Sequence, residues 1–369
     1  MNQKLFPWEW LRFFYIMNSK HIHKLLSNLY FGAPKHQIDE KDKIIIFSDL
    51  HLGNGSGQDD FTNNSQHFIK IMRDYYIEND YKLVLNGDIE ELYRFSLKSI
   101  VKKWAEIFEI FDHFDQQDKL YKIVGNHDYE LNYNQFPALN EKIQQSIRFK
   151  YKDENIFLFH GHQTTSFFNN FHKINTYVLR YIANPLRIKN GTYSVDSIKR
   201  FNTEKRAYDF ASRKKIIAII GHTHRPLFES MAKRDYLMYR IENMLRKYPK
   251  ADLKRRRKIE RNIKNFRSEL RHLSDKKNHQ NLLSGLYNDK ILVPCLFNSG
   301  AVIGKRGMTG LEIENGNISL IYWFHSDRSQ RYLKYKGVEC QQLGDSKIHK
   351  AILKKESLDY IFTRIKLLS

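Results

Sequence analysis

The chain has 369 residues, of which 41% are hydrophobic and 14% aromatic, so it can build a sizeable core and is not a disordered polypeptide. Its formal net charge of +21 favours anionic partners, namely nucleic acid, phosphorylated metabolites or an acidic membrane surface, although a solvated basic surface would give the same charge. Cys295 and Cys340 have no CxxC spacing, so they indicate neither a disulfide framework nor a zinc–thiolate site, and they fit a reducing cytoplasm.

Residues 1–40 form an amphipathic segment that is rich in bulky side chains. No stretch reaches the length of a membrane span, and charged residues interrupt this segment too often for a cleavable signal peptide. One interpretation of residues 5–31 is a helix packed on the domain's own core. The other is an interfacial helix, because aromatic and basic residues suit a membrane surface. We therefore expect a cytoplasmic protein, with peripheral contact at the inner membrane as the alternative.

Short apolar stretches alternate with stretches of helical spacing. Five of them predict strands in chain order, at residues 43–48, 82–85, 120–124, 156–159 and 216–220. Residues 64–78 and 97–113 have helical spacing. Later strands are expected at residues 291–297, 308–314 and 317–324, and Asn315-Gly316 is a hairpin turn signal between the last two. This alternation predicts an α/β domain.

Two insertions interrupt the strands of a catalytic domain that we place at residues 41–330. Residues 163–215 are basic and aromatic and are expected to form a helical lid. Residues 229–285 contain two heptad-like apolar seams with Pro249 between them, which predicts an antiparallel helical hairpin. Lys and Arg far outnumber Asp and Glu in this hairpin, so it could bind nucleic acid or anionic lipid, or simply present a solvated face. Residues 331–369 are expected to be a C-terminal tail.

Polar side chains follow each of the five strands. Asp49 and His51 follow the first, and residues two apart in an extended chain point to the same side. The strand-end set consists of Asp49, His51, Asp88, Asn126, His127, His160, His222 and His224. A single strand-end histidine is more often a hydrogen-bonded surface group than a ligand, but five successive strands ending in this way indicate one site.

This set offers oxygen and nitrogen ligands for two divalent ions, with Asp88 free to bridge them. Two adjacent metal ions clamp a phosphoryl group and generate a hydroxide between them, which is the arrangement of phosphatases and nucleases. A histidine near the leaving group can protonate it or neutralise developing charge.

The motifs resemble those of the calcineurin-like metallophosphoesterase superfamily over roughly residues 43–228 and the closing strands to about 324. The resemblance implies a four-layer fold of two central β-sheets flanked by helices. It implies a first metal ion on Asp49, His51, Asp88 and His224, and a second on Asp88, Asn126, His160 and His222. It also implies that His127 is a catalytic histidine that binds no metal and is paired with Asp128. Mn²⁺ is the expected ion, with Fe and Zn²⁺ as alternatives.

Within this superfamily the chain is most similar to UDP-2,3-diacylglucosamine hydrolases. The similarity lies in Ser48–Leu52, in Glu91 three residues after Asp88, in a basic lid, and in the sequence Gly221–Pro226 that contains Arg225. It implies a nucleotide-linked lipid substrate, with Glu91 and Arg225 as candidate substrate-binding residues. This chain has His127 where that family has arginine, His162 where it has an acid, and the 229–285 insertion besides.

These observations favour an enzyme that hydrolyses a phosphodiester or pyrophosphate bond of an anionic substrate by attack of a metal-bridging hydroxide. A metal-dependent nuclease that uses the basic hairpin is the first alternative, and binding that falls steeply with salt would favour it. A non-catalytic scaffold on the same fold is the second. Candidate ligands at every motif argue against the scaffold.

Overall fold

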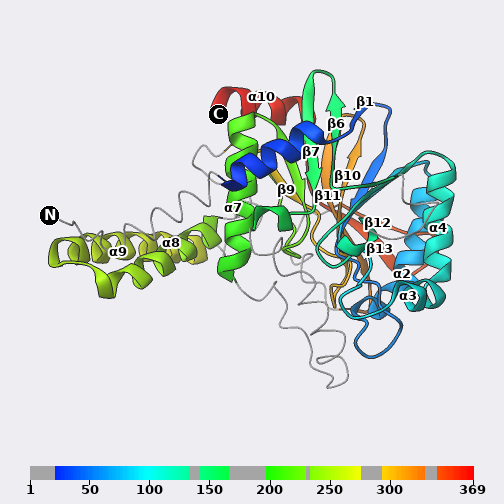
Figure 1. Ribbon diagram of the computed structural model, residues 1–369, viewed down its shortest axis with the longest axis horizontal. Helices are drawn as coiled ribbons and strands as arrows, with labels where there is room; N and C mark the ends of the chain where they lie inside the picture. The colour runs from blue at the N-terminus through cyan, green and yellow to red at the C-terminus, as the bar shows by residue number, and fades with distance from the viewer. Residues whose placement is uncertain (1–20, 133–141, 166–196, 230–232, 276–292, 329–338) are drawn as a thin grey trace.

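Two mixed β-sheets form the centre of the computed structural model, and helices cover their outer faces (Figure 1). The structure describes residues 21–132, 142–165, 197–229, 233–275, 293–328 and 339–369. The predicted α/β architecture, with two central sheets flanked by helices, is confirmed. None of the described helices is both long enough and apolar enough to cross a membrane.

The first sheet has five strands in the order β1-β6-β7-β8-β9. Its strands are β1 (Lys35–Ile38), β6 (Ser146–Tyr151), β7 (Glu154–Phe159), β8 (Ile217–Ile220) and β9 (Leu296–Asn298). Only β6 and β7 run antiparallel to each other, so β7, β8 and β9 point their carboxyl ends to the same edge.

The second sheet has eight strands in the order β12-β13-β11-β10-β2-β3-β4-β5. Its parallel half is β2 (Ile44–Phe47), β3 (Lys82–Asn86), β4 (Leu120–Ile123) and β5 (Ile143–Gln144). Its antiparallel half is β10 (Met308–Glu314), β11 (Asn317–His325), β12 (Glu339–Gln342) and β13 (Ile348–Ser357).

Strand β2 shows how the sequence builds the layers. All four of its side chains are fully buried, because each face of the strand lies in a different core. Ile44 and Ile46 pack in the core between the sheets, whereas Ile45 and Phe47 pack in the core on the outer side of the second sheet. A continuous apolar run is what such a doubly covered strand requires.

The outer core of the second sheet is covered by α2 (Ser65–Ile71), a π-helical segment (Met72–Ile77), α3 (Leu97–Lys103) and α4 (Ala105–Gln116). The other core also receives a helix at residues 21–32, α7 (Ser197–Lys214) and α10 (Leu358–Leu368). Short 3-10 segments lie at Asp60–Asn63, Tyr129–Asn132 and His162–Thr164.

The insertion after β8 forms the predicted helical hairpin. Helix α8 (Lys233–Lys247) and helix α9 (Leu253–Asp275) are joined by the 3-10 turn Tyr248–Lys250, which contains Pro249. The two helices lie side by side and project away from the sheets (Figure 1).

The structure corrects the predicted role of the C-terminal tail. Residues 339–369 are part of the domain, because β13 pairs along the whole length of β11 and α10 buries Leu358, Ile361 and Phe362. The described part of the predicted lid, α7, packs Phe201 and Phe210 into the core. Residues 166–196, the rest of that lid, lie outside the described residues.

The N-terminal segment supports the core-packed interpretation where the structure describes it. Ile22, Leu26 and Tyr30 of the helix at 21–32 are buried in the core that contains the first sheet. Residues 1–20 lie outside the described residues.

Candidate active site

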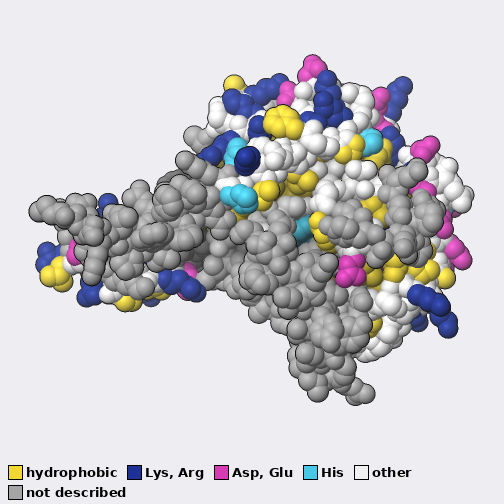
Figure 2. Space-filling view, in the orientation of Figure 1, with side chains coloured by type: hydrophobic (Ala, Val, Ile, Leu, Met, Phe, Trp, Pro, Cys, Tyr) yellow, Lys and Arg dark blue, Asp and Glu magenta, His cyan; other side chains and the backbone are white. Residues whose placement is uncertain are grey.

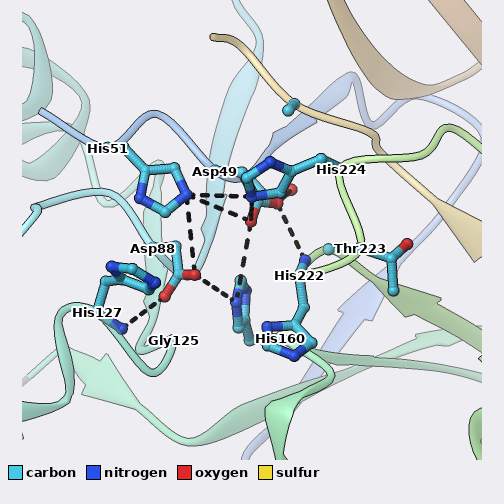
Figure 3. Close-up of polar contacts among 12 residues, drawn as sticks. Asp49, His51, Asp88, Gly125, His127, His160, His222, Thr223 and His224 are labelled. Carbon is cyan, nitrogen blue, oxygen red and sulfur yellow. Dashed lines mark hydrogen bonds and ion pairs between the residues drawn. The ribbon is translucent and has the colours of Figure 1, made fainter. Parts of the chain in front are cut away.

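The predicted site residues come from both sheets and meet at one edge. Asp49 and His51 follow β2, Asp88 follows β3, and Asn126 and His127 follow β4 in the second sheet. The first sheet supplies the remaining three, which are His160 after β7 and His222 and His224 after β8. Figure 3 shows the two aspartates and the five histidines of this set converging from the two sides. The structure therefore brings the predicted strand-end residues together at one edge.

Backbone strain is concentrated at this edge. Five of the predicted metal-ligand residues have positive φ angles, a region that residues with a Cβ atom seldom adopt. These angles are 55° at Asp49, 48° at His51, 54° at Asp88, 64° at His222 and 52° at His224. Such conformations persist only where the surrounding structure enforces them, and they are typical of functional sites.

The glycines of two motifs let the ligands approach the backbone closely. A Cβ atom at Gly125 would lie 2.1 Å from Asp88 Oδ1, and one at Gly87 would lie 2.5 Å from His160 Nδ1. Either contact would displace a candidate ligand, so both positions require glycine.

The potential ligand atoms form overlapping groups. Asp49 Oδ1 lies 3.0 Å from His224 Nε2, and His51 Nε2 lies 3.1 Å from the same nitrogen. Asp88 Oδ2 lies 3.0 Å from His160 Nε2. Within 4.8 Å of one another, ligand atoms cluster in three sets: Asp49, His51 and His224; Asp88, His160 and His222; and His51, Asp88 and His127.

Three buried atoms of the cluster are suited to bind cations. Asn126 Oδ1 forms no hydrogen bond with the described residues, whereas Asp49 Oδ1 and His160 Nε2 face other candidate ligands, His224 and Asp88. The Nδ1 atom of His160 lies 2.8 Å from the carbonyl oxygen of Asn86, to which it donates, so Nε2 is the nitrogen left for a ligand bond. A buried polar atom without a partner is costly, and so is a buried cluster of carboxylates and imidazoles, and a pair of divalent ions would satisfy both, so the residues fit this cofactor.

The two aspartates are held as carboxylates. Burial by itself would raise the pKa of Asp49, but the nearby His224 and His160 lower it. Burial likewise opposes ionisation of Asp88, whose pKa nevertheless falls well below its usual range because of His160 and His127. The site therefore keeps two negative charges in a buried place.

The imidazoles respond in different directions. Burial would lower the pKa of His51, but its contact with Glu91 and the nearby Asp88 raise it to about 10. Burial would likewise lower the pKa of His160, but the nearby Asp88 raises it to about 9. Burial and the neighbouring His160 lower the pKa of His222 to about 3. In the protein without metal, protons on His51 and His160 therefore balance the carboxylates.

The partner of His127 differs from the predicted one. Its Nδ1 atom lies 2.8 Å from the Glu91 carboxylate, which also lies 3.0 Å from His51 Nδ1. Asp128 instead accepts hydrogen bonds from the backbone N–H groups of Gly125 at 2.5 Å and Ile89 at 2.7 Å. It is fully buried, and burial together with Glu90 raises its pKa to about 7. Asp128 therefore holds the loops after β3 and β4 together.

Glu91 was predicted to contact substrate, but its carboxylate is directed at two histidine rings and its side chain is only 8% exposed. Since the Nδ1 atoms of His51 and His127 both contact this carboxylate, Glu91 orients the two rings and leaves their Nε2 atoms for other partners. The spacing of Glu91 three residues after Asp88 was visible in the sequence, whereas its partners depend on the turn between them.

A buried network that the sequence did not reveal holds the loop with His222 and His224. Glu204 of α7 accepts hydrogen bonds from Thr223 Oγ1 at 2.9 Å and from Arg225 Nε at 3.2 Å. Asn298 Nδ2 donates to the same Thr223 hydroxyl at 3.0 Å. Arg225, a predicted substrate-binding residue, is thus an ion-pair partner of Glu204 whose side chain is 22% exposed.

The comparison with protein-family models agrees with this chemistry. The calcineurin-like phosphoesterase family model matches residues 42–253. No curated protein matches the chain significantly. Among solved structures, the chain is similar to a conserved uncharacterized protein of Streptococcus pneumoniae TIGR4, described as a predicted phosphoesterase, at 13% identity and a TM-score of 0.27 over 80% of this chain and 94% of the other. A TM-score this low adds no weight. The family match spans more than half of the chain, which therefore belongs to the calcineurin-like phosphoesterase family and is a metallophosphoesterase, a hydrolase acting on phosphoester bonds.

Proposed function

We propose that this protein uses two divalent metal ions to hydrolyse a phosphodiester or pyrophosphate bond. The observation that carries the proposal is the position of Asp88 between two groups of ligands. Its Oδ2 atom lies 3.0 Å from His160 Nε2 on one side and 4.0 Å from His51 Nε2 on the other. A carboxylate placed in this way can serve both ions.

In this proposal Asp49, His51 and His224 would hold the first ion together with Asp88. Asn126, His160 and His222 would hold the second, again together with Asp88. Oxygen and imidazole ligands of this kind suit Mn²⁺, Fe or Zn²⁺, and we propose Mn²⁺ as the first to test. Bound there, two such ions would supply Lewis acidity and an activated water.

The chain's own residues position the reaction. Glu91 fixes the ring of His127 through Nδ1, which leaves Nε2 as the atom that can donate to a phosphoryl or leaving-group oxygen. The side chain of His127 is 19% exposed, whereas that of His160 is fully buried, so His127 is the more accessible to substrate. We assign His127 as the catalytic histidine.

For the substrate we propose a nucleotide-linked lipid such as UDP-2,3-diacylglucosamine. The proposal rests on the sequence similarity of the motifs around Asp49, Glu91 and Arg225 to UDP-2,3-diacylglucosamine hydrolases. A nuclease activity is the alternative, because a basic hairpin could bind a phosphate backbone. The experiment is hydrolysis of a substrate panel by metal-stripped enzyme with and without Mn²⁺. The panel contains bis-p-nitrophenyl phosphate, UDP-2,3-diacylglucosamine, cyclic nucleotides and single-stranded DNA.

Metal-dependent cleavage concentrated on the UDP-lipid would support the proposed substrate, and cleavage mainly of DNA would replace it with the nuclease. Activity that is equal with and without metal, or that survives in the Asp88→Ala variant, would contradict the dinuclear mechanism. Two bound metal ions without cleavage of any panel member would contradict the proposed substrate classes.

A further inference from the structure

The α8–α9 hairpin has a groove along one side that the hydrolytic reaction does not use. The groove has a volume of about 470 Å³ and is partly open to solvent. Leu245, Tyr248 and Ile263 contribute apolar surface to its lining. Lys264, Arg267 and Arg271 lie along it on α9. Glu260 is the acidic residue of this lining. Apolar surface next to an excess of cationic side chains is the pattern that an anionic amphiphile requires.

Large aliphatic side chains near the hairpin turn are exposed. Leu245 is 50% exposed and Leu253, the first residue of α9, is 76% exposed, whereas Leu237 near the base of the hairpin is buried. A hairpin that needed only solubility would carry polar residues at the two exposed positions. These leucines therefore mark apolar surface for a partner.

The cations of α9 form a stripe. Arg257, Arg261, Lys264, Arg267 and Arg271 are spaced by four, three, three and four residues, which places them on one face of the helix. All five are exposed, and none of them forms an ion pair with another residue of the described part of the chain. The acidic Glu260 lies three residues after Arg257 and four before Lys264, but its carboxylate accepts from the Tyr248 hydroxyl. Like charges at these spacings destabilise a helix, so the excess of cations in the stripe favours an anionic partner over a solvated face.

Other contacts hold the hairpin in shape. Asp252 caps α9 by accepting from the Arg255 N–H at 2.8 Å. The guanidinium of Arg240 on α8 lies 5.2 Å from the ring centre of Phe266 on α9. The groove and the stripe are therefore presented on a fixed scaffold, on the insertion that follows the loop with His222 and His224 (Figure 1).

The aromatic residue of the groove argues against nucleic acid. Binding of single strands relies on bases that stack on accessible aromatic rings. The guanidinium of Arg256 lies 5.4 Å from the centre of the Tyr248 ring, and the Tyr248 hydroxyl donates to Glu260. The remaining apolar lining is aliphatic, which suits acyl chains. Figure 2 shows Lys, Arg and hydrophobic side chains together along the lower edge of the hairpin.

We propose that the hairpin is a docking surface for an anionic lipid membrane. The stripe of α9 meets the phosphate headgroups, and Leu245 and Leu253 enter the interface beside them. Docking of this kind would bring the adjoining active-site loop close to the lipid surface. This inference concerns the hairpin and holds whichever phosphoester the enzyme hydrolyses.

The test is sedimentation of the full-length protein with vesicles of phosphatidylcholine alone or with one third phosphatidylglycerol. The charge-reversal variant is Lys264→Glu/Arg267→Glu/Arg271→Glu. We expect the wild type to bind only the anionic vesicles. The variant should bind them at least about 100-fold more weakly, because the loss of three cations alone has this effect at a charged surface and the three new carboxylates are repelled. A Leu253→Gln variant should bind at low salt and dissociate at a lower salt concentration than the wild type.

The matched control is Lys41→Glu/Lys98→Glu/Lys102→Glu, which reverses three exposed charges on the body of the domain. It should bind anionic vesicles within about twofold of the wild type, since the lost charges lie far from the stripe. Both triple variants should keep wild-type helicity and wild-type hydrolysis of soluble bis-p-nitrophenyl phosphate. Equal loss in both triple variants, or no binding of the wild type to anionic vesicles, would overturn the proposal. So would tighter binding to duplex DNA than to anionic vesicles at the same salt.

Discussion

The carboxylate of Glu91 lies 3.0 Å from His51 Nδ1 and 2.8 Å from His127 Nδ1. One buried side chain thus orients a proposed metal ligand and the proposed catalytic histidine at once. The rings of His51 and His127 are nearly perpendicular, with centres 4.7 Å apart. Because both rings contact Glu91, the orientation of each depends on the position of this acid.

Replacement of Glu91 by glutamine should affect metal binding and turnover together. The amide keeps the shape but loses the negative charge, so both Nδ1 contacts weaken. Loss of such an orienting contact typically costs about 10–100-fold in metal affinity or activity. We expect this range for kcat/KM at saturating Mn²⁺, with weaker metal binding measured by calorimetry. Asp128→Asn is the comparison, and a larger loss of turnover in that variant would favour the pairing first predicted from the sequence.

Replacement of His127 by alanine should separate catalysis from metal binding. In the proposed assignment His127 binds no metal, so turnover should fall by about 10²–10⁴-fold while both ions stay bound. Asp88→Ala should lose metal as well as activity, because Asp88 serves both ions. Metal content by mass spectrometry after gel filtration distinguishes the two. Release of an ion from His127→Ala would show that His127 is a ligand, as its proximity to His51 and Asp88 permits.

Metal binding should release protons. His51 and His160 have pKa values of about 10 and about 9, so both rings are protonated at pH 7 and must lose a proton to bind a cation. Binding of both metal ions should displace about two protons in total at pH 7, one from each ring. The affinity for Mn²⁺ should rise as the pH approaches 9. Titration calorimetry in buffers of different ionisation enthalpy measures this number. A count near zero would contradict the charge balance described for the site.

The same pKa values set the sign of a stability change in the metal-free protein. Because both folded-state values lie above the ordinary histidine value of 6.5, their contribution is complete below pH 6.5 and is lost as the pH rises through 9 to 10. The midpoint of urea unfolding should therefore fall between pH 7 and pH 10 without metal. Saturating Mn²⁺ should reduce this fall. A urea midpoint that rises between pH 7 and pH 10 in the metal-free protein would contradict the prediction.

The strands that carry the site were predictable because their patterns are local. β2, β3, β4, β7 and β8 are short apolar runs that end in polar residues, and such runs are the signal for strands covered on both faces. Strand β6 was not predicted, although its alternation was readable, since Ile147, Phe149 and Tyr151 point inward and Lys150 does not.

The C-terminal strand and the buried ion pairs were not readable in the same way. Strand β13 carries several lysines, and the buried Lys350 pairs with Glu312 of β10 at 2.6 Å and donates to the Tyr75 hydroxyl at 2.8 Å. Likewise the pairing of Glu91 with His127 depends on the conformation of the turns after β3 and β4. Partners of this kind are far apart in the chain, and no local pattern identifies them.

The loop that carries His222 and His224 should depend on Glu204 for its conformation. Both histidines have positive φ angles, and Thr223 between them donates its hydroxyl to the fully buried Glu204 carboxylate. In Glu204→Gln the charge that pairs with Arg225 is lost, and we expect a loss of about 1–3 kcal/mol in the free energy of unfolding. Relaxation of the loop should also lower the affinity of the ion held by His224.

A positioning role for Glu204 would be separated from a purely structural one by metal titration. Excess Mn²⁺ should restore most of the activity of Glu204→Gln at a temperature well below its unfolding midpoint, because the ligands themselves are intact. Glu204→Asp, which keeps the charge on a shorter side chain, should lie between Glu204→Gln and the wild type in Mn²⁺ affinity. Loss of stability with unchanged Mn²⁺ affinity in both variants would mean that Glu204 supports the fold but does not position the loop.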